Sequence, residues 1–466
     1  MGNAASVQCL LSALGGNPSL LALPTQPGYY PNIVQPYNLD HQVLPAVVTF
    51  PQTSAQVAGV VQCAARHGYR VQAKSGGHSY GNYGSSTGEV SINLSNMGHF
   101  SIDSKTYRAT MGPGLQLGQV TEQLFNSGKR SIAHGTCPSV GLGGHGTVGG
   151  AGPSARLHGL TIDHVEEMEV VLANGTIVRA SSSKNSDLFF AMRGAGASFG
   201  IVTEFVFRTE PAPAELVNYV YEWTARDVKT RAQVFKSWQK FIARSNLPRE
   251  FSSTMTVSPS AIIIAGAYFG PQKAFNALGF IGSFPPPQVS QATVSTNWLQ
   301  VSESWGQQIQ DSGIASPSYF YAKSLGFTPQ TLIADATADR MFQYLATAEN
   351  GTDLWAVNFE VGAGAINDVA VGATAFPHRD KLWWMLSYAK TRGPVSQTTV
   401  NFLAGLNNVA TSGKPTAVYG EYAGYVDPRE DNDRARMDYW GPNLQRLRRI
   451  KAAVDPFDIF HNQQSV

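Results

Sequence analysis

The chain has 466 residues, a formal net charge of +2, and charged side chains at only 14% of its positions. This length allows two or three domains with a well-buried core. The nearly balanced charge gives no broad basic surface, so we expect no nucleic-acid partner, and no apolar run is long enough to predict a membrane-spanning helix.

The first predicted elements form a strand, a helix and a second strand. Residues 47–50 are extended, and Ser54 is a candidate N-cap for a helix whose valines and alanines recur at helical spacing. Gly68 ends this helix, and residues 70–73 form the next strand. The pattern predicts a βαβ unit whose second strand runs directly into a glycine turn.

Further along, Asn174-Gly175 predicts a hairpin turn between two strands, and another strand ends near Pro211 in a linker-like segment. Residues 214–416 differ, with a helix over residues 224–243, a strand over residues 261–269 and seven of the eight tryptophans. From Tyr419 the pattern predicts a strand, a helix over residues 445–453 and an extended tail. We therefore expect one split domain with a large insertion.

The three cysteines are Cys9, Cys63 and Cys137. A Cys9–Cys63 disulfide with a special Cys137 is one interpretation, and three reduced, buried cysteines is the other. Three glycosylation sequons, at Asn93, Asn174 and Asn350, are compatible with a mature secreted protein but also arise by chance in a chain of this length.

Two glycine-rich stretches carry the chemistry: "KSGGHSYGNYGS" at residues 74–85 and "HGTCPSVGLGGHGTVGGAG" at residues 134–152. Backbone N–H groups in such turns can converge on a pyrophosphate, although a glycine turn is often only a turn. A zinc site from His78, His134, Cys137 and His145 lacks the paired ligand spacing of known sites, so we expect no metal. A catalytic Cys–His pair lacks a recognisable nucleophile motif.

Several segments in order resemble the berberine-bridge-enzyme-like group of FAD-linked oxidases, within the vanillyl-alcohol-oxidase superfamily. Besides the two glycine stretches they are "RLHGLTIDHVEEMEVVLANGTIVRAS", "DLFFAMRGAGASFGIVTEF" and "NLQRLRRIKAAVDPFDIFHNQQSV". The resemblance implies an α+β fold: a two-part FAD-binding domain of the PCMH type at residues 1–213 (core 45–213) and 417–466. A substrate-binding domain with an antiparallel sheet flanked by helices is then inserted at residues 214–416.

The resemblance also implies FAD held by two covalent bonds, from a ring nitrogen of His78 to the flavin 8α carbon and from the Cys137 sulfur to flavin C6. Val140 would be the residue beside the flavin that controls access of oxygen. The other cofactor-binding residues carried over from the family are Ser75, Gly76, Gly77, Ser79, Gly143, Gly144, Gly149, Ile201 and Asn462.

Within this group the chain is most similar to oligosaccharide oxidases, which oxidise the anomeric carbon of a reducing sugar to a lactone and release hydrogen peroxide. The resemblance implies Tyr425 as the base, on a strand, and Glu360 as its acidic partner, where related sugar oxidases favour Asp. Tyr80, Asn358 and Leu386 would line the substrate site. Without the resemblance, Tyr425 would be interpreted as a core tyrosine and Glu360 as a solvent-facing strand residue.

Leu386 stands where sugar oxidases can carry a polar side chain, so an oxidase or oxidative cyclase of an aromatic alcohol or another secondary metabolite is the alternative. A non-catalytic flavoprotein or lectin is a third hypothesis. The expected partners are a small carbohydrate and O2, and we expect a secreted monomer.

Overall fold

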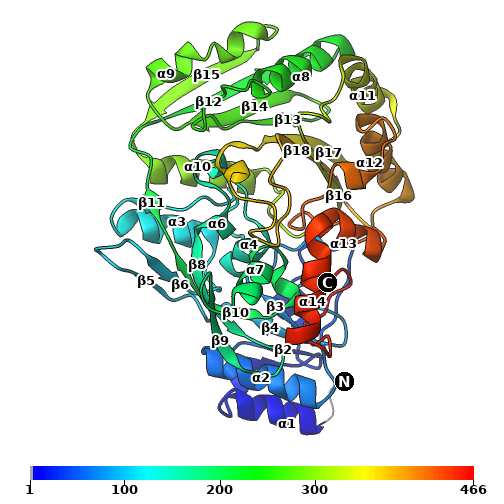
Figure 1. The fold of residues 1–466 in the computed structure, drawn as a ribbon. Coiled ribbons are helices and arrows are strands. Elements are labelled where there is room, and N and C mark those ends of the chain that lie inside the picture. The colour runs from blue at the N-terminus through cyan, green and yellow to red at the C-terminus, as the bar shows by residue number, and fades with distance from the viewer. Residues whose placement is uncertain (1–3) are drawn as a thin grey trace.

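The structure, a computed structural model, describes residues 4–466. The fold is α+β, as the sequence predicts, and it has two halves (Figure 1): an upper half built on one large sheet, and a lower half that contains both ends of the chain. Among the helices of residues 4–466, none combines the length and the apolar character needed to cross a membrane.

The first sheet of the lower half has the strand order β1-β2-β4-β3. Its strands span Leu21–Ala22 (β1), Val47–Thr49 (β2), Val90–Asn93 (β4) and Val71–Lys74 (β3). Helix α2 (Ser54–Arg66) connects β2 to β3, which confirms the predicted strand–helix–strand order. The two strands are not neighbours, because β4 lies between them and pairs in parallel with both.

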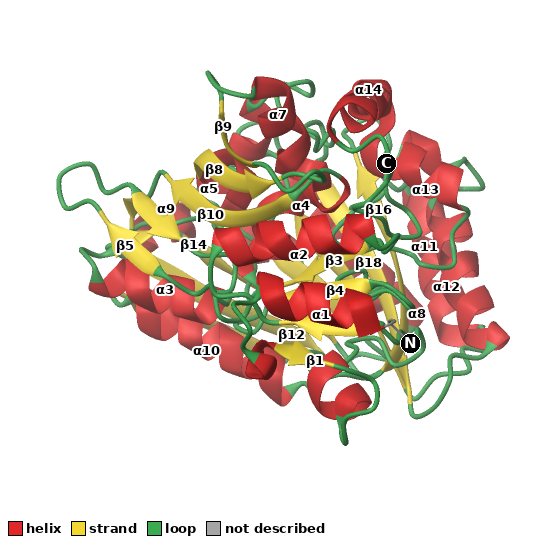
Figure 2. Cartoon of the chain, turned by 90° about the horizontal axis from the view of Figure 1, so that it is seen from below, coloured by secondary structure: helices red, strands yellow, loops and turns green. Residues whose placement is uncertain are grey.

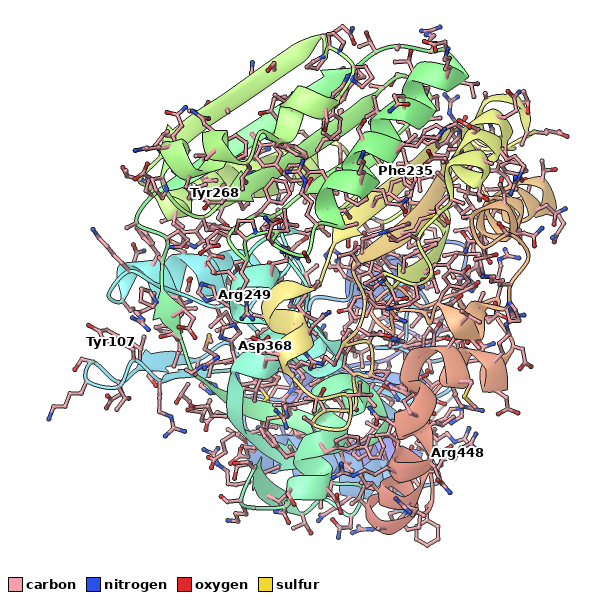
Figure 3. The ribbon with its side chains drawn as sticks, turned by 45° about the horizontal axis from the view of Figure 1, so that its top comes forward. Tyr107, Phe235, Arg249, Tyr268, Asp368 and Arg448 are labelled. Atoms are coloured by element: carbon pink, nitrogen blue, oxygen red, sulfur yellow. A yellow bond between two sulfur atoms is a disulfide. The ribbon has the colours of Figure 1, made fainter. Side chains whose placement is uncertain are left out.

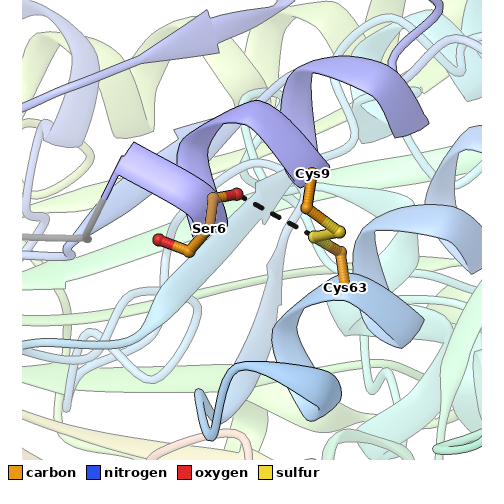
Figure 4. Close-up of a disulfide and its surroundings, with 3 residues drawn as sticks. All are labelled: Ser6, Cys9 and Cys63. Carbon is orange, nitrogen blue, oxygen red and sulfur yellow. Dashed lines mark hydrogen bonds between the residues drawn. A yellow bond between two sulfur atoms is a disulfide. The ribbon is translucent and has the colours of Figure 1, made fainter.

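Helix α2 begins one residue earlier than the predicted cap implied. Thr53, rather than Ser54, is the N-cap, and its hydroxyl accepts a hydrogen bond of 3.2 Å from the Gln56 backbone N–H. Helix α1 (Ala4–Ala13) packs beside α2 (Figure 2), and the Cys9–Cys63 disulfide joins the two helices (Figure 4). This pairing confirms the first interpretation of the cysteines.

The second sheet of the lower half is antiparallel, in the order β5-β6-β10-β8-β9. Its strands span Phe100–Ile102 (β5), Ala109–Met111 (β6), Ile201–Phe207 (β10), Val165–Val171 (β8) and Ile177–Ser181 (β9). The predicted hairpin between β8 and β9 is present, with Gly175 at a φ of 79°. The surrounding helices are α3 (Leu117–Asn126), α4 (Leu142–Val148), α5 (Ala155–His158), α6 (Thr161–His164) and α7 (Ser186–Ala195).

A short ladder between β7 (Arg130–Ser131) and β11 (Glu210–Pro211) precedes the upper half, so the expected linker begins with a paired strand. The upper half is built on a seven-stranded sheet in the order β15-β12-β14-β13-β17-β18-β16. Its strands span Leu216–Trp223 (β12), Thr254–Val257 (β13), Ile262–Tyr268 (β14), Val289–Ser295 (β15), Tyr319–Phe327 (β16), Leu354–Val361 (β17) and Trp383–Thr391 (β18).

One face of this sheet is covered by α8 (Val228–Ile242), α11 (Asp335–Thr347) and α12 (Gln397–Ala410). Phe235 of α8 packs edge-on against Phe359 of β17, with ring centroids 5.0 Å apart, and Figure 3 shows Phe235 on this helix. Side chains alternate along a strand, so Asn358 and Glu360, on either side of Phe359, point to the opposite face. Two further helices are α9 (Gln272–Ala277) and α10 (Trp298–Asp311).

Buried arginines fasten the two halves together. Arg379 lies in the loop before β18 and makes two hydrogen bonds of 2.8 Å to the Asp163 carboxylate of α6. Arg156 of α5 donates to the Phe251 carbonyl at 2.8 Å, in the loop before β13. The same loop also carries Arg249, which is exposed and makes a two-point ion pair at 2.6 and 2.9 Å with Asp368 of the same half (Figure 3).

The chain then returns to the lower half through α13 (Asn432–Trp440) and α14 (Leu444–Val454), the latter in agreement with the predicted helix. Beyond it, the Val71 N–H donates to the Ile459 carbonyl at 2.8 Å, so the tail lies along β3. The strand predicted from Tyr419 is wrong: residues 419–431 form turns, and Gly420 has a φ of 73°. A glycine in this left-handed region breaks an extended pattern.

Candidate active site

The two glycine-rich stretches cross each other with their backbones in contact. A Cβ added at Gly76 would lie 2.3 Å from the Gly141 nitrogen, and one added at Gly141 would lie 2.0 Å from the Gly76 nitrogen. Neither position can accept a side chain without moving the other loop. Ser75 fixes the crossing, since its hydroxyl donates to the Pro113 carbonyl at 2.6 Å and accepts from the Gly143 N–H at 3.3 Å.

The first loop presents unpaired backbone donors. The N–H groups of Gly76, Gly77, His78 and Ser79 donate no hydrogen bond to any residue that the structure describes, and Gly77 has a φ of 76°. Gly144, at the start of α4, has no atom within 4 Å of an added Cβ. Consecutive free N–H groups beside open space form a cradle for an anion, so these loops fit the pyrophosphate of FAD.

His78 and Cys137 come together at this crossing. The hydroxyl of Ser139 lies 3.0 Å from His78 Nε2 and 3.5 Å from Cys137 Sγ. The Tyr37 ring packs on the imidazole, with centroids 4.5 Å apart. Burial lowers the pKa of His78 to about 4, so the imidazole is neutral at pH 7 and keeps a nucleophilic lone pair.

Tyr425 and Glu360 also come together, although they are distant in sequence. The Tyr425 hydroxyl donates a long hydrogen bond of 3.5 Å to Glu360 Oε1. The Tyr425 ring stacks on Tyr80, with centroids 5.6 Å apart and an interplanar angle of 22°. Tyr80 follows His78 by two positions, so this stack places the Tyr425–Glu360 pair next to the loop that carries His78.

Burial shifts the acidity of both members of the pair. It raises the pKa of the Glu360 carboxyl to about 7, and burial together with the charge of Glu360 raises the pKa of Tyr425 well above its ordinary value. A phenol with a raised pKa cannot ionise alone at pH 7. It can accept a proton only while it passes its own proton to the carboxylate beside it.

The sheet supplies the surface under this pair. Asn358 lies opposite Leu386 in the β17–β18 ladder, and the Thr256 hydroxyl donates to Asn358 Oδ1 at 2.9 Å. Leu386 is buried in an apolar cluster, and the other members of that cluster are Tyr37, Phe320, Ala322 and Tyr388, with Tyr80 and Tyr425 packed against it. The surface therefore combines one amide and one carboxyl with a largely aromatic wall.

Two predicted cofactor residues come from other segments of the lower half. Ile201 begins β10 and packs in a core cluster with Val171 and Phe460. Asn462 lies in the C-terminal tail, where its Oδ1 accepts from the Gln464 N–H at 3.0 Å. Gly149, by contrast, lies against the site: an added Cβ would meet the Tyr422 ring at 2.9 Å.

The sequence reasoning missed three side chains. Tyr422 accepts a hydrogen bond of 2.9 Å from the Gly150 N–H and packs edge-on against Tyr425. Ser139 stands between Cys137 and Val140 in a stretch already singled out, so its position was a usable signal. Tyr37 comes from an irregular N-terminal segment with no pattern that marks it.

Comparison with known families and proteins gives matches over nearly the whole chain. The FAD binding domain family matches residues 45–181, and the family described as berberine and berberine like matches residues 421–466. The FAD-linked oxidoreductase sorD of Penicillium rubens is 51% identical over 98% of this chain and 97% of its own. The chitooligosaccharide oxidase of Gibberella zeae is 36% identical over 92% of this chain and 89% of its own.

A solved structure of glucooligosaccharide oxidase from Acremonium strictum superimposes with a TM-score of 0.90 at 29% identity, and the match covers 99% of both chains. That oxidase is described with a 6-S-cysteinyl, 8α-N1-histidyl FAD. Family, relatives and fold thus agree on an FAD-dependent oxidoreductase.

Proposed function

Because the chain belongs to the berberine-bridge-enzyme-like family of FAD-linked oxidoreductases, we propose that it oxidises the anomeric C1 hydroxyl of a reducing oligosaccharide to a lactone, with O2 reduced to H2O2. The observation that carries the proposal is the stack of Tyr425 on Tyr80. It holds the Tyr425–Glu360 proton acceptor beside the loop that would carry the flavin.

In this proposal the glycine loops hold FAD. His78 and Cys137 form the two covalent links, and the free N–H groups of residues 76–79 bind the pyrophosphate. Ser75, Val140, Gly143, Gly144 and Gly149 shape the remaining wall at the crossing, while Ile201 and Asn462 act from the core and the tail. The bound FAD supplies the electron sink that accepts hydride and returns electrons to O2.

Side chains of the protein accept the proton of the substrate hydroxyl. Tyr425 accepts the proton of the substrate hydroxyl and passes its own proton to Glu360, whose pKa of about 7 suits a group that must accept and release a proton near neutrality. Asn358 and Tyr80 orient the substrate from two sides. Removing the hydroxyl proton during hydride loss avoids a high-energy oxocarbenium-like charge at C1.

One observation favours a second substrate class, an aromatic alcohol or another secondary metabolite. Leu386 offers no hydrogen bond, and its neighbours Tyr37, Phe320 and Tyr388 form an apolar wall. An aromatic substrate gains from such a wall, whereas a sugar hydroxyl placed there would lose its partner. The 51% identity to sorD, against 36% to the chitooligosaccharide oxidase, is compatible with either class.

The test is hydrogen peroxide release by the purified yellow protein from two substrate panels. Cello-, xylo-, malto- and chito-oligosaccharides form one panel, and aromatic alcohols form the other. Activity on the first panel supports the sugar oxidase, and activity only on the second supports the alternative. If neither panel bleaches the flavin under anaerobic conditions, both proposals fail.

Leu386→Gln separates the two classes further, because it adds an amide to the wall. If the substrate is an oligosaccharide, we expect the variant to have a lower KM than the wild type. If the substrate is an aromatic alcohol, we expect a higher KM.

We also propose that the protein is a secreted monomer. The Cys9–Cys63 disulfide supports secretion, since such bonds persist in oxidising compartments. The proposed domains are residues 1–213 with 417–466 for FAD and residues 214–416 for substrate. The division of the sheets between the two halves supports this proposal.

A further inference from the structure

The Ser139 hydroxyl lies between the two nucleophiles proposed to bind the flavin. It lies 3.0 Å from His78 Nε2 and 3.5 Å from Cys137 Sγ. Neither side chain has another hydrogen-bond partner among residues 4–466. The Tyr37 ring packs on the imidazole at 4.5 Å between centroids.

A serine hydroxyl has one proton and two acceptor positions, so it cannot donate to both neighbours. The nucleophile of a cysteine is its thiolate, which can only accept a hydrogen bond. During attachment the hydroxyl therefore donates to the sulfur and must accept from Nε2–H. That direction places the imidazole proton on Nε2 and leaves the Nδ1 lone pair free.

We propose that Ser139 is a positioning residue for covalent flavin attachment, with one hydroxyl that sets the reactive tautomer of His78 and orients the sulfur of Cys137. This inference rests on the proposed bicovalent FAD. It goes further in assigning a role to a residue that contributes no covalent bond itself.

The chemistry balances at both positions. At His78, the Nδ1–C8α bond forms, one proton leaves C8α and one leaves Nε2 of the imidazole, and two electrons enter the flavin. At Cys137, the S–C6 bond forms, the thiol proton and the C6 proton leave, and two electrons again enter the flavin. Each time, O2 accepts the two electrons and two protons and leaves as H2O2.

The reverse direction of the hydrogen bonds would not support attachment. If the hydroxyl donated to Nε2, the imidazole proton would lie on Nδ1 and block attack on C8α. Without any hydroxyl, the tautomer of His78 would be free to change and the sulfur of Cys137 would lose its hydrogen-bond partner. Both attachments should therefore slow together when Ser139 is removed.

The experiment compares Ser139→Ala with Ser139→Thr, which keeps the hydroxyl. Thr136→Val is the matched control. It also removes a hydroxyl from this loop, but in the described residues the Thr136 hydroxyl bonds to neither His78 nor Cys137. Protein from riboflavin-limited cells receives FAD in air. Acid precipitation then measures total covalent flavin over time, and peptide mass spectrometry measures the His78 and Cys137 links separately.

We expect Ser139→Ala to slow both links by about tenfold or more, a change of ~1.4 kcal/mol in the barrier, with Ser139→Thr and Thr136→Val near the wild-type rate. Ser139→Gly provides a second hydroxyl-free variant if the alanine variant folds poorly.

Wild-type rates at both residues in Ser139→Ala would overturn the inference, and so would slowing at only one residue. A wild-type protein without covalent flavin would instead contradict the proposed cofactor linkage. The two failures are therefore distinguishable.

Discussion

The Tyr425 hydroxyl lies 3.5 Å from Glu360 Oε1, although 65 positions separate the two residues. Tyr425 comes from a turn before α13 and Glu360 from the site-facing side of β17. A hydrogen bond this long is typical of a catalytic pair that tightens when substrate binds. In the proposed mechanism the pair acts as one proton acceptor, with Glu360 as the final site of the proton.

This arrangement predicts a pH dependence for flavin reduction. Burial raises the pKa of Glu360 to about 7, and only the carboxylate can accept the phenol proton. We expect the anaerobic reduction rate to rise with pH through about 7 and to level off above it. Glu360→Asp should keep this rise, whereas Glu360→Gln should abolish it. A wild-type rise retained in Glu360→Gln would assign the titration to another group.

The gatekeeper assignment predicts an effect on oxygen alone. Val140 is partly buried against the core of the lower half, and its carbonyl accepts from the Leu117 N–H at 2.9 Å. Since packed interiors have little slack, Val140→Leu should fill the space that O2 needs. We expect reoxidation of the reduced flavin to slow by about tenfold, or ~1.4 kcal/mol, with reduction nearly unchanged. Val140→Ala is the control, and equal stopped-flow reoxidation rates in Val140→Leu and wild type would refute the assignment.

The disulfide predicts a difference in stability. Cys9 and Cys63 are 54 positions apart, so their bond removes much of the freedom of the unfolded chain. Replacing both by alanine should lower the free energy of unfolding by about 2–4 kcal/mol. Urea unfolding of the two proteins measures this difference. The same midpoint with and without the bond would show that α1 is held by packing alone.

The buried carboxyl of Glu421 predicts that the protein becomes less stable as pH rises. Glu421 is fully buried, and neither carboxyl oxygen has a hydrogen-bond partner in the described part of the chain. Burial raises its pKa to about 8. The folded state therefore holds a proton that the unfolded state releases above about pH 4.5, so stability declines as pH rises toward 8.

Glu421→Gln removes this titration. Its melting temperature should fall less than that of the wild type between pH 5 and pH 8, while Glu349→Gln, at an exposed position, should follow the wild type. If the melting temperatures of Glu421→Gln and wild type changed equally with pH, the Glu421 carboxyl would already be charged in the folded protein.

Local features of the fold could be predicted from the sequence where turn chemistry is strong. The Asn174-Gly175 hairpin and the helix that ends before Gly68 depend on residues that tolerate a positive φ, and both are present. Pairing between distant segments leaves no comparable signal. The position of β4 between β2 and β3 is decided by tertiary contacts alone.

The candidate site shows the same division. The spacing of glycines around His78 and Cys137 was enough to single out both stretches, whose backbones approach each other closely at Gly76 and Gly141. Tyr425 was expected on a strand, but Gly420 and Gly424 allow a turn in which its ring meets Tyr80. Tyr37 could not be found, because only the folded chain brings its irregular segment against His78.

The most direct test of the proposed chemistry is the rate of anaerobic flavin reduction in Tyr425→Phe, measured by stopped flow with whichever substrate the panels identify. This variant keeps the stack on Tyr80 and removes only the hydroxyl. We predict a loss of about 10²–10⁴ in the reduction rate, with covalent flavin retained and reoxidation unchanged. Reduction within about threefold of the wild-type rate, worth under 1 kcal/mol, would contradict Tyr425 as the base.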